Sequence, residues 1–413
     1  MAKKKKKNKV KAKKIIQGDG IKNNLKKPFL ENEIEVNTID DYKNKQVSAG
    51  VELEDIGGNL NEPFDPSLVR IETKKFNTIV LMDRIKDNVI DLQPGFQRKS
   101  NIWKPEVQSR LIESILIRIP IPVFYMDTRN EDKWVIVDGL QRLTALKRYI
   151  LDQNLKLNGL EFLTELEGKI FDDLPPKYQR RIKEAELTFY NIEKDSPKEL
   201  TFNIFKRINT GGLPLSTQEI RHALNQGKAT EVLEALSISK EFLDATNKSI
   251  SGMRMADREC ILRFFAFTIT PPRQYIKNDF DTFLNNTMEY LNQIPSEEME
   301  KLIIQFKISM RIAYRTFDND AFRKRYDENA DRFPISKALF ESWSVNLNKL
   351  NNEDPEFFLK IMNKKEMLKK RFIKLMNEDR VFEKAITQGT GERNKVRIRF
   401  DCIESILREV IYD

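Results

Sequence analysis

The sequence has a single histidine, His222, and only two cysteines, Cys260 and Cys402, among its 413 residues. Zinc sites usually take several histidine or cysteine ligands, so a conventional zinc site is not expected. A Ser-His-Asp triad would have to use His222, and no nucleophile-elbow motif accompanies it. A His-Asn-His nuclease centre needs more than one histidine and is excluded. We expect His222 to be a packing or helix-surface residue.

Long apolar runs are also missing. The most apolar stretch, residues 115–126, contains Arg118 and two prolines, and it is shorter than the roughly 18 residues that a membrane span requires. The charged N-terminus is not followed by the apolar stretch of a secretory signal. Two cysteines without a spacing pattern fit a reducing compartment. These features predict a cytoplasmic protein without a membrane partner.

The excess positive charge is confined to the N-terminus. The chain has 72 basic and 63 acidic residues, and nine of the basic ones are Lys3, Lys4, Lys5, Lys6, Lys7, Lys9, Lys11, Lys13 and Lys14. Subtracting these nine from 72 leaves 63, so the rest of the chain is formally neutral. Such a tail attracts DNA without reading its sequence, or it serves only as a solubiliser. Both interpretations remain open.

Hydrophobic periodicity predicts an α+β protein with three parts. Residues 1–62 are polar and are expected to be a disordered, lysine-rich tail and linker, with order beginning near Pro63. Residues 63–195 mix short strands and amphipathic helices, whereas residues 196–413 look helical almost throughout. The expected strands are 69–72, 123–126 and 134–137, and the expected helices of the first half are 76–89, 105–119 and 140–151.

The second half carries clear helix signals. The expected helices include 198–208, 257–267, 280–291, 297–317 and 337–350. Ser216 and Glu219 have the spacing of a capping box that opens another helix. The phenylalanines at 264, 265 and 267 are expected in the core, because apolar clustering at helical spacing is typical of buried faces.

The clearest candidate site is the segment from Val137 to Arg142. An apolar strand ends in Asp138, turns at Gly139 and enters a helix whose N-terminal N–H groups and dipole favour a phosphate. Arg142 has donors for phosphate oxygens, Asp138 is a candidate Mg²⁺ ligand or water-orienting group, and Gln141 is a candidate for positioning water. The ordinary structural interpretation is an Asp N-cap followed by exposed side chains.

The surrounding residues resemble a known family. Phe96-Gln97-Arg98, Trp103, Leu111–Leu116, Ile119–Pro122 and the stretch from Asp138 to Leu146 together resemble the N-terminal domain family of GmrSD-type restriction systems, whose signature is usually DGQQR. The likeness continues through Phe205–Gly212 and Leu215–Arg221, and more weakly to Arg258-Glu259 and Gln388–Gly391. It covers about residues 63–413 and is most specific between Phe96 and Arg221.

The resemblance implies a small ParB/sulfiredoxin-like α/β domain at 63–195 and a larger all-α domain at 196–413. It implies a nucleoside triphosphate ligand, with Mg²⁺ assumed from phosphate chemistry, in bacterial antiviral defence. Asp138, Gln141 and Arg142 match the catalytic positions. The implied nucleotide-binding residues are Gln97, Arg98, Gly139, Arg207, Asn209, Thr210, Gly211 and Gly212. The sequence departs from the signature at Leu140, which is expected to pack inward.

Two hypotheses follow from this resemblance. The first is an NTP-hydrolysing defence protein that acts on or near DNA. The second is a non-catalytic DNA-binding or adaptor protein that retains the ParB-like fold. Many relatives also carry a His-Asn-His nuclease half, which this sequence lacks, so DNA cleavage would need a nuclease or another defence-system partner. The turn at Gly211 and Gly212 ends a helix in one interpretation and closes over a nucleotide in the other.

Overall fold

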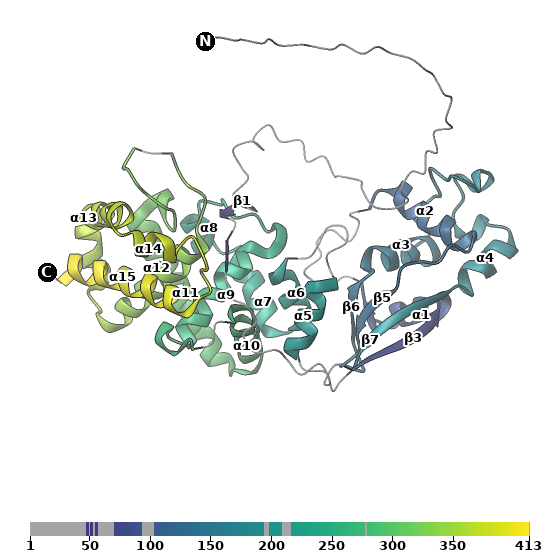
Figure 1. Cartoon of the computed structure of the whole chain (residues 1–413), viewed down its shortest axis with the longest axis horizontal. Helices are drawn as coiled ribbons and strands as arrows, with labels where there is room; N and C mark the ends of the chain where they lie inside the picture. Colours follow the sequence, from purple (N-terminus) through teal and green to yellow (C-terminus); the bar gives the residue numbers. More distant parts are fainter. Residues whose placement is uncertain are drawn as a thin grey trace, which may run out of the picture. The chain divides into compact units, whose positions relative to one another are not determined.

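The computed structural model describes most of the chain from residue 47 onward. The described residues are 47–48, 50–52, 54–56, 70–92, 103–193, 198–208, 216–276, 279–329 and 331–412. A small mixed sheet with its helices comes first, and a longer, mostly helical part follows (Figure 1). The expected α+β fold class is confirmed. The nine lysines of the tail lie outside the described residues.

The sheet has five strands in the spatial order β3-β7-β5-β6-β4. The strands are β3 (Ile71–Asn77), β4 (Ile90–Asp91), β5 (Phe124–Asp127), β6 (Trp134–Asp138) and β7 (Glu186–Ile192). The pairs β4–β6 and β5–β7 are parallel, whereas β3–β7 and β5–β6 are antiparallel. The expected strands at 123–126 and 134–137 correspond to β5 and β6. The strands β4 and β7 were not predicted.

The edge strand β3 is longer than the sequence pattern predicts. It pairs with β7 along its whole length, from Ile71 opposite Ile192 to Asn77 opposite Glu186. The rings of Phe76 and Phe189 meet edge to face, with their centroids 5.4 Å apart. This contact keeps Phe76 in the sheet, so the following helix starts at Thr78 instead of residue 76. The contact across the strands therefore outweighs the helical periodicity of the local sequence.

Four helices accompany the sheet and complete its core. They are α1 (Thr78–Lys86), α2 (Pro105–Leu116), α3 (Leu140–Ile150) and α4 (Pro176–Lys183). The helix α2 packs on α3 and α4. Fully buried side chains from helices and strands meet in one cluster, including Leu81, Ile112, Leu116, Phe124, Leu143 and Phe189. Apolar burial of this kind fixes the positions of β6 and α3, on which the candidate site is built.

The helix α2 ends at Leu116, one turn before the expected end at residue 119. Arg118 has a left-handed φ of 62°, and Ile119 is exposed. Pro120 follows, and a proline disfavours helical geometry in the residue before it. The motif residue Glu113 is buried on this helix. Its carboxylate accepts backbone N–H bonds from residues 161–163 at 2.7–3.0 Å, so it anchors that loop.

The second part is a bundle of helices. Its α-helices are α5 (Lys198–Ile208), α6 (Thr217–Leu224), α7 (Lys228–Ser237), α8 (Lys240–Ala245), α9 (Ala256–Ile269), α10 (Phe280–Gln293), α11 (Ser296–Phe317), α12 (Lys337–Glu353), α13 (Phe357–Glu378), α14 (Arg380–Ala385) and α15 (Arg393–Tyr412). The expected helices in this region are all present, with ends that differ from the expected ones by at most three residues. None of the described helices is both long and apolar enough to cross a bilayer.

The core of the bundle is rich in aromatic side chains. Phe264, Phe265 and Phe267 are at most 1% exposed, which confirms the expectation that they are core residues. Phe264 meets Phe306 edge to face at 5.2 Å between centroids, and Phe267 lies 4.9 Å from Phe400. These contacts tie α9 to α11 and α15. Base stacking by these phenylalanines is therefore excluded in this fold.

A small apolar cluster joins the sheet to the first helices of the bundle. Val137 of β6 and Ile192 of β7 pack with Phe202 and Phe205 of α5 and with Ile220 of α6. Val137 immediately precedes the candidate site residue Asp138. The helix α5 is therefore packed against the strand that carries the site.

The segment before the sheet does not follow the expectation that order begins near Pro63. The strands β1 (Val47–Ser48) and β2 (Val51–Glu52) form a hairpin, and Val51 is buried in the core of the helical bundle. Farther along, the backbone N–H groups of Thr390 and Gly391 donate to the carbonyls of residues 55 and 56 at 2.8 and 2.7 Å. The weakly matching motif at residues 388–391 therefore forms backbone hydrogen bonds with this N-terminal segment.

Candidate functional site

The predicted site is a sharp strand-to-helix turn. The strand β6 ends at Asp138 and α3 begins at Leu140, with Gly139 between them at φ 97° and ψ 9°. A Cβ atom at Gly139 would lie 2.2 Å from Cδ1 of Phe124. Only glycine fits this left-handed backbone and this close contact. Gly139 occupies the N-cap position of α3, and no side chain of the described residues caps its first turn, so the ordinary interpretation of Asp138 as an N-cap is wrong.

Arg142 turns inward from α3 instead of projecting into solvent. It is 8% exposed. Its Nη1 donates to the carbonyl of Pro122, and its Nη2 donates to the carbonyl of Val123 at 3.1 Å. Nη2 also donates to Oδ2 of Asp138 at 2.7 Å. The guanidinium therefore binds the proline-rich segment before β5 to the turn that carries Asp138.

Arg142 contacts the aromatic ring of Phe124 as well as the carboxylate of Asp138. Its guanidinium carbon lies 4.2 Å from the centroid of the Phe124 ring. Burial lowers the pKa of Arg142 from its ordinary value, while Asp138 acts in the opposite direction. Arginine remains charged under these conditions because its ordinary pKa is very high. In this arrangement Arg142 positions Asp138, and its inward contacts were not foreseen from the sequence.

Of the two neighbouring motif residues, Leu140 lies in the core and Gln141 contacts a loop. Leu140 is 6% exposed and belongs to the core of the first half, as expected for the residue that departs from the family signature. Gln141 is half-buried, and its Oε1 has a long contact of 3.5 Å with the backbone N–H of Trp103. The Trp103 carbonyl accepts from Nε2 of Gln108 at 2.7 Å. The start of α2 is thus tied to α3.

The sequence did not reveal a pair of tyrosines of which one, Tyr125, lies beside Asp138. Tyr125 of β5 is opposite Asp138 in the antiparallel register and opposite Tyr190 in the parallel register of β7. The two tyrosine rings have centroids 5.2 Å apart. Burial, Tyr190 and Asp138 all raise the pKa of Tyr125. Recognising this pair required β7 and its register, which no local pattern supplied.

The expected nucleotide contacts from the second half are described only in part. Arg207 lies exposed in the last turn of α5, the helix whose Phe202 and Phe205 pack on Val137. The remaining expected nucleotide ligands, Gln97, Arg98, Asn209, Thr210, Gly211 and Gly212, lie outside the described residues. Their roles stay predictions.

The motif that opens α6 is structural. The Ser216 hydroxyl accepts from the N–H of Glu219 at 3.1 Å, and the Glu219 carboxylate accepts from the N–H of Ser216 at 2.6 Å. The predicted capping box is confirmed. Arg221 is 1% exposed and pairs with Asp281 at 3.0 Å, while its Nε donates to Asn285 at 3.1 Å. These residues attach α6 to α10.

His222 is a buried packing residue, with 2% of its surface exposed. Burial and the nearby Arg258 lower its pKa to about 4, although Glu234 acts in the opposite direction. The ordinary value is about 6.5. Between pH 6.5 and 4 the unfolded chain binds a proton that the folded protein does not. The stability due to neutral His222 is therefore complete above pH 6.5 and is lost as the pH falls toward 4.

We predict that His222→Asn reduces the loss of unfolding free energy between pH 7 and pH 4.5 by about 2–3 kcal/mol relative to the unmodified chain. Urea unfolding of both proteins at the two pH values measures this difference. His222 is the only histidine, so the variant has no imidazole that titrates in this pH range. The contributions of the carboxylates are the same in both proteins. Parallel losses of stability in the two proteins would contradict the buried neutral state.

A metal site is not preformed in the described part of the chain. No group of three or more His, Cys, Asp or Glu side chains is placed there to hold an ion. Asp138 offers a single carboxylate, and its Oδ2 is paired with Arg142. Any ion at this turn would need further ligands from phosphate and water.

Fold and site together define an α+β protein with a mixed sheet, a strand–glycine–helix turn and a following helical bundle. Residues 78–225 match the family model described as "GmrSD restriction endonuclease, N-terminal domain". Over these residues the chain is similar to a GmrSD-type N-terminal domain, which confirms the resemblance seen in the sequence. A search of the curated proteins found no match. A domain of this family suggests a component of a restriction-type defence system.

Proposed function

We propose that this chain is the nucleotide-binding, NTP-hydrolysing component of a restriction-type defence system that acts on or near DNA. The observation that carries the proposal is the Asp138–Gly139 turn at the N-terminus of α3, within residues that match the GmrSD-type domain. Uncapped N–H groups at the start of a helix, together with its dipole, favour a phosphate. Gly139 lets the backbone come close to such a ligand.

Asp138 and Gln141 are the proposed catalytic side chains. The carboxylate of Asp138 is fixed through Oδ2 by Arg142, and Oδ1 has no hydrogen bond to another described residue. Oδ1 is suited to accept a hydrogen bond from the attacking water, and Gln141 is suited to orient that water. Arg142 acts as a positioning residue in this proposal, because its donors bind Asp138 and two backbone carbonyls.

Mg²⁺ is compatible with this arrangement only as an ion shared with the nucleotide. Sites for Mg²⁺ in nucleotide enzymes commonly supply one or two carboxylates, with phosphate oxygens and water as the other ligands. Asp138 is the residue that would hold the ion. When bound, the ion would neutralise part of the phosphate charge.

Additional positive charge is proposed to come from Arg98 and Arg207. Since Arg142 is buried and paired, it neutralises little of a multiply charged phosphate chain. Arg207 is exposed on the helix that packs against β6. We therefore propose that a nucleotide at the turn also contacts the start of the helical half, including the segment from Asn209 to Gly212.

The test is phosphate release from ATP and GTP by the purified full chain, with and without DNA. We predict that Asp138→Asn lowers kcat by about 100-fold or more, the effect of removing a catalytic contact worth about 3 kcal/mol. Asp152→Asn, which removes a carboxylate paired with Lys147 on the surface, is the matched control. Turnover of Asp138→Asn at the level of the control would reject the catalytic assignment.

A non-catalytic DNA-binding or adaptor protein is the second candidate, favoured by the lysine tail and by the inward position of Arg142. In that case the full chain would bind nucleotide or DNA without releasing phosphate. A nuclease or other defence-system protein would then supply the chemistry.

Deletion of residues 1–14 is predicted to weaken non-specific DNA binding and to flatten its salt dependence. Nine lysines that contact phosphates release counterions, and the slope of log K against log salt scales with the number of such contacts. Titration of a labelled duplex at several salt concentrations measures this slope. Equal slopes and equal low-salt affinities for both proteins would identify the tail as a solubiliser.

A further inference from the structure

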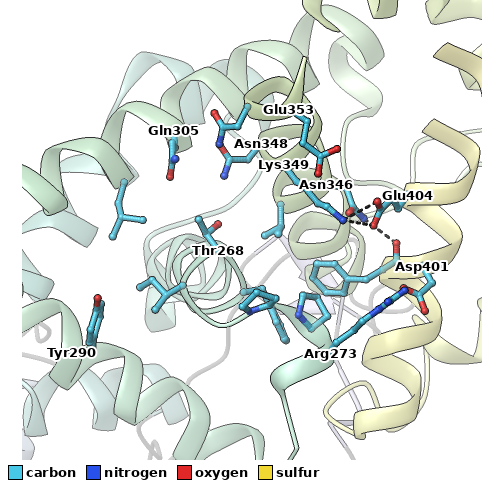
Figure 2. A pocket seen from close by; sticks show the side chains of 18 of the residues that line it. Thr268, Arg273, Tyr290, Gln305, Asn346, Asn348, Lys349, Glu353, Asp401 and Glu404 are labelled. Atoms are coloured by element: carbon cyan, nitrogen blue, oxygen red, sulfur yellow. Dashed lines mark hydrogen bonds and ion pairs between the residues drawn. The ribbon is translucent and has the colours of Figure 1, made fainter. Parts of the chain in front are cut away.

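The helical half contains a cavity that is separate from the Asp138 turn. Its volume is about 630 Å³, and residues of α9, α10, α11, α12 and α15 line it together with the short turn Pro272–Gln274 (Figure 2). A volume of this size is in the range of small-molecule sites.

The cavity is lined by amide side chains with unused hydrogen-bonding groups. Asn346 and Asn348 of α12 are 3% and 5% exposed, and Gln305 of α11 lines the same cavity (Figure 2). Nδ2 of Asn346 donates to the carbonyl of Phe400 at 3.0 Å, and Oδ1 of Asn348 accepts from Asn352 at 3.3 Å. Within the described part of the chain, the other amide atom of each asparagine has no hydrogen bond.

A buried hydroxyl adds to this unused capacity. Oγ1 of Thr268, at the end of α9, is buried in the cavity wall without a hydrogen-bond partner in the part of the chain that the structure describes. Buried polar groups are nearly always satisfied, so such atoms commonly mark a missing ligand or water.

The charged residues at the cavity argue against an anionic ligand. The carboxylates of Glu298, Glu353, Asp401 and Glu404 outnumber the cations of Arg273 and Lys349. Lys349 is bound to Glu404 at 2.8 Å. Even when Arg408, which pairs with two of these carboxylates, is counted, the carboxylates outnumber the cations, so a phosphate would meet no surplus of positive charge.

The same carboxylates already form ion pairs or hydrogen bonds within the protein, which argues against a sugar held by acidic groups. Glu404 and Glu353 both pair with Arg408, at 2.8 and 2.6 Å. Glu298 accepts from the hydroxyl of Tyr290 at 2.7 Å. The groups left for a ligand are therefore amides and a hydroxyl.

We propose that this cavity binds a neutral nucleoside through its base. Asparagine and glutamine amides present a donor and an acceptor in one plane, which matches the edge of a base, above all adenine. Ile269, Pro271 and Pro272 supply an apolar wall against which the base can pack. The lack of a surplus of positive charge favours the nucleoside over its phosphates. This site is independent of the nucleotide proposed at Asp138.

The experiment is titration calorimetry of the full chain with adenosine, guanosine, cytidine and uridine, and with their 5′-monophosphates. Asp138→Asn protein is titrated in parallel to test whether the first site contributes to the binding. We expect at least one nucleoside to bind, adenosine most tightly, with about 10-fold weaker binding of its monophosphate.

Three α12 variants locate the binding. Asn348→Leu and Asn352→Leu are expected to weaken adenosine binding about 10-fold, whereas Asn351→Leu, which does not line the cavity, leaves it unchanged. Thermal unfolding checks that each variant is folded, and exposed Asn352 provides a variant that leaves the core intact.

Three outcomes would overturn the proposal. They are absence of nucleoside binding at millimolar concentration, full affinity in both Asn348→Leu and Asn352→Leu, and loss of binding in Asp138→Asn. The last outcome would assign the nucleoside to the first site. Displacement of adenosine by glucose would instead identify the cavity as a sugar site.

Discussion

Glu341→Ala is expected to lower the free energy of unfolding by about 3–5 kcal/mol, because it leaves the buried Arg399 without its counter-charge. The Glu341 side chain is fully buried on α12 between two arginines that are themselves at most 1% exposed. Nε of Arg399 donates to its Oε1 at 2.9 Å, and Nη1 of Arg263 donates to its Oε2 at 3.3 Å. Both guanidinium groups are buried from bulk water.

The remainder of this charge network would not compensate for the loss. Arg263 also binds Glu54 at 2.5 Å and Glu259 at 2.7 Å, and Lys337 binds Glu259 at 2.8 Å. Burial alone would raise the pKa of Glu259, but Lys337 and Arg263 hold it well below its ordinary value. These carboxylates are already paired with Arg263 and Lys337. They therefore cannot replace Glu341, which is the only carboxylate partner of Arg399 among the described residues.

Urea unfolding measures the effect of Glu341→Ala. The matched control is Glu353→Ala on the same helix, which removes a half-exposed pair with Arg408 and is expected to cost no more than about 1 kcal/mol. A similar small cost for Glu341→Ala would show that water enters the network and that its charges are screened.

Arg142→Ala is the second change with a large expected effect, a loss of about 2–4 kcal/mol of stability together with loss of nucleotide binding. The substitution leaves the carbonyls of Pro122 and Val123 without their charged donor and frees Asp138. Arg142→Lys should not restore either property, because an ammonium group lacks the planar fork that reaches both carbonyls and the carboxylate.

Thermal unfolding and nucleotide titration on the same samples separate the two roles of Arg142. Lys147→Ala, on the exposed side of α3, is the control and should change neither property strongly. If Arg142→Ala unfolds at the temperature of the control yet no longer binds nucleotide, Arg142 contacts the ligand directly. That outcome would support the role first assigned to it from the sequence motif.

Local sequence patterns predicted much of the candidate site. The apolar run before Asp138, the glycine after it and the amphipathic helix that follows predict a strand, a turn and a helix, and all three are present. Such patterns work because backbone geometry and apolar periodicity depend on nearby residues. For the same reason the pattern at 76–89 misplaced the start of α1, where pairing with β7 keeps Phe76 in the sheet.

The partners of polar side chains could not be predicted in this way. In the sequence, Arg142 looks like an exposed residue one turn into a helix, and Glu341 and Arg399 are 58 residues apart. Glu54 lies in a polar stretch expected to be disordered, yet its carboxylate binds Arg263, which is 209 residues away along the chain. The energy of a buried charge depends on which groups the fold brings next to it.

The sequence by itself determined the helical and strand segments, the glycine-dependent turn and the likeness to the GmrSD-type domain, because these depend on residue spacing and on short motifs. Only the tertiary structure decided that Arg142 faces inward, that Tyr125 lies beside Asp138 and that the asparagines of α12 line a cavity. Each of these facts depends on the packing of segments that are distant in the chain. Burial, and with it the electrostatic behaviour of a polar group, is a property of that packing.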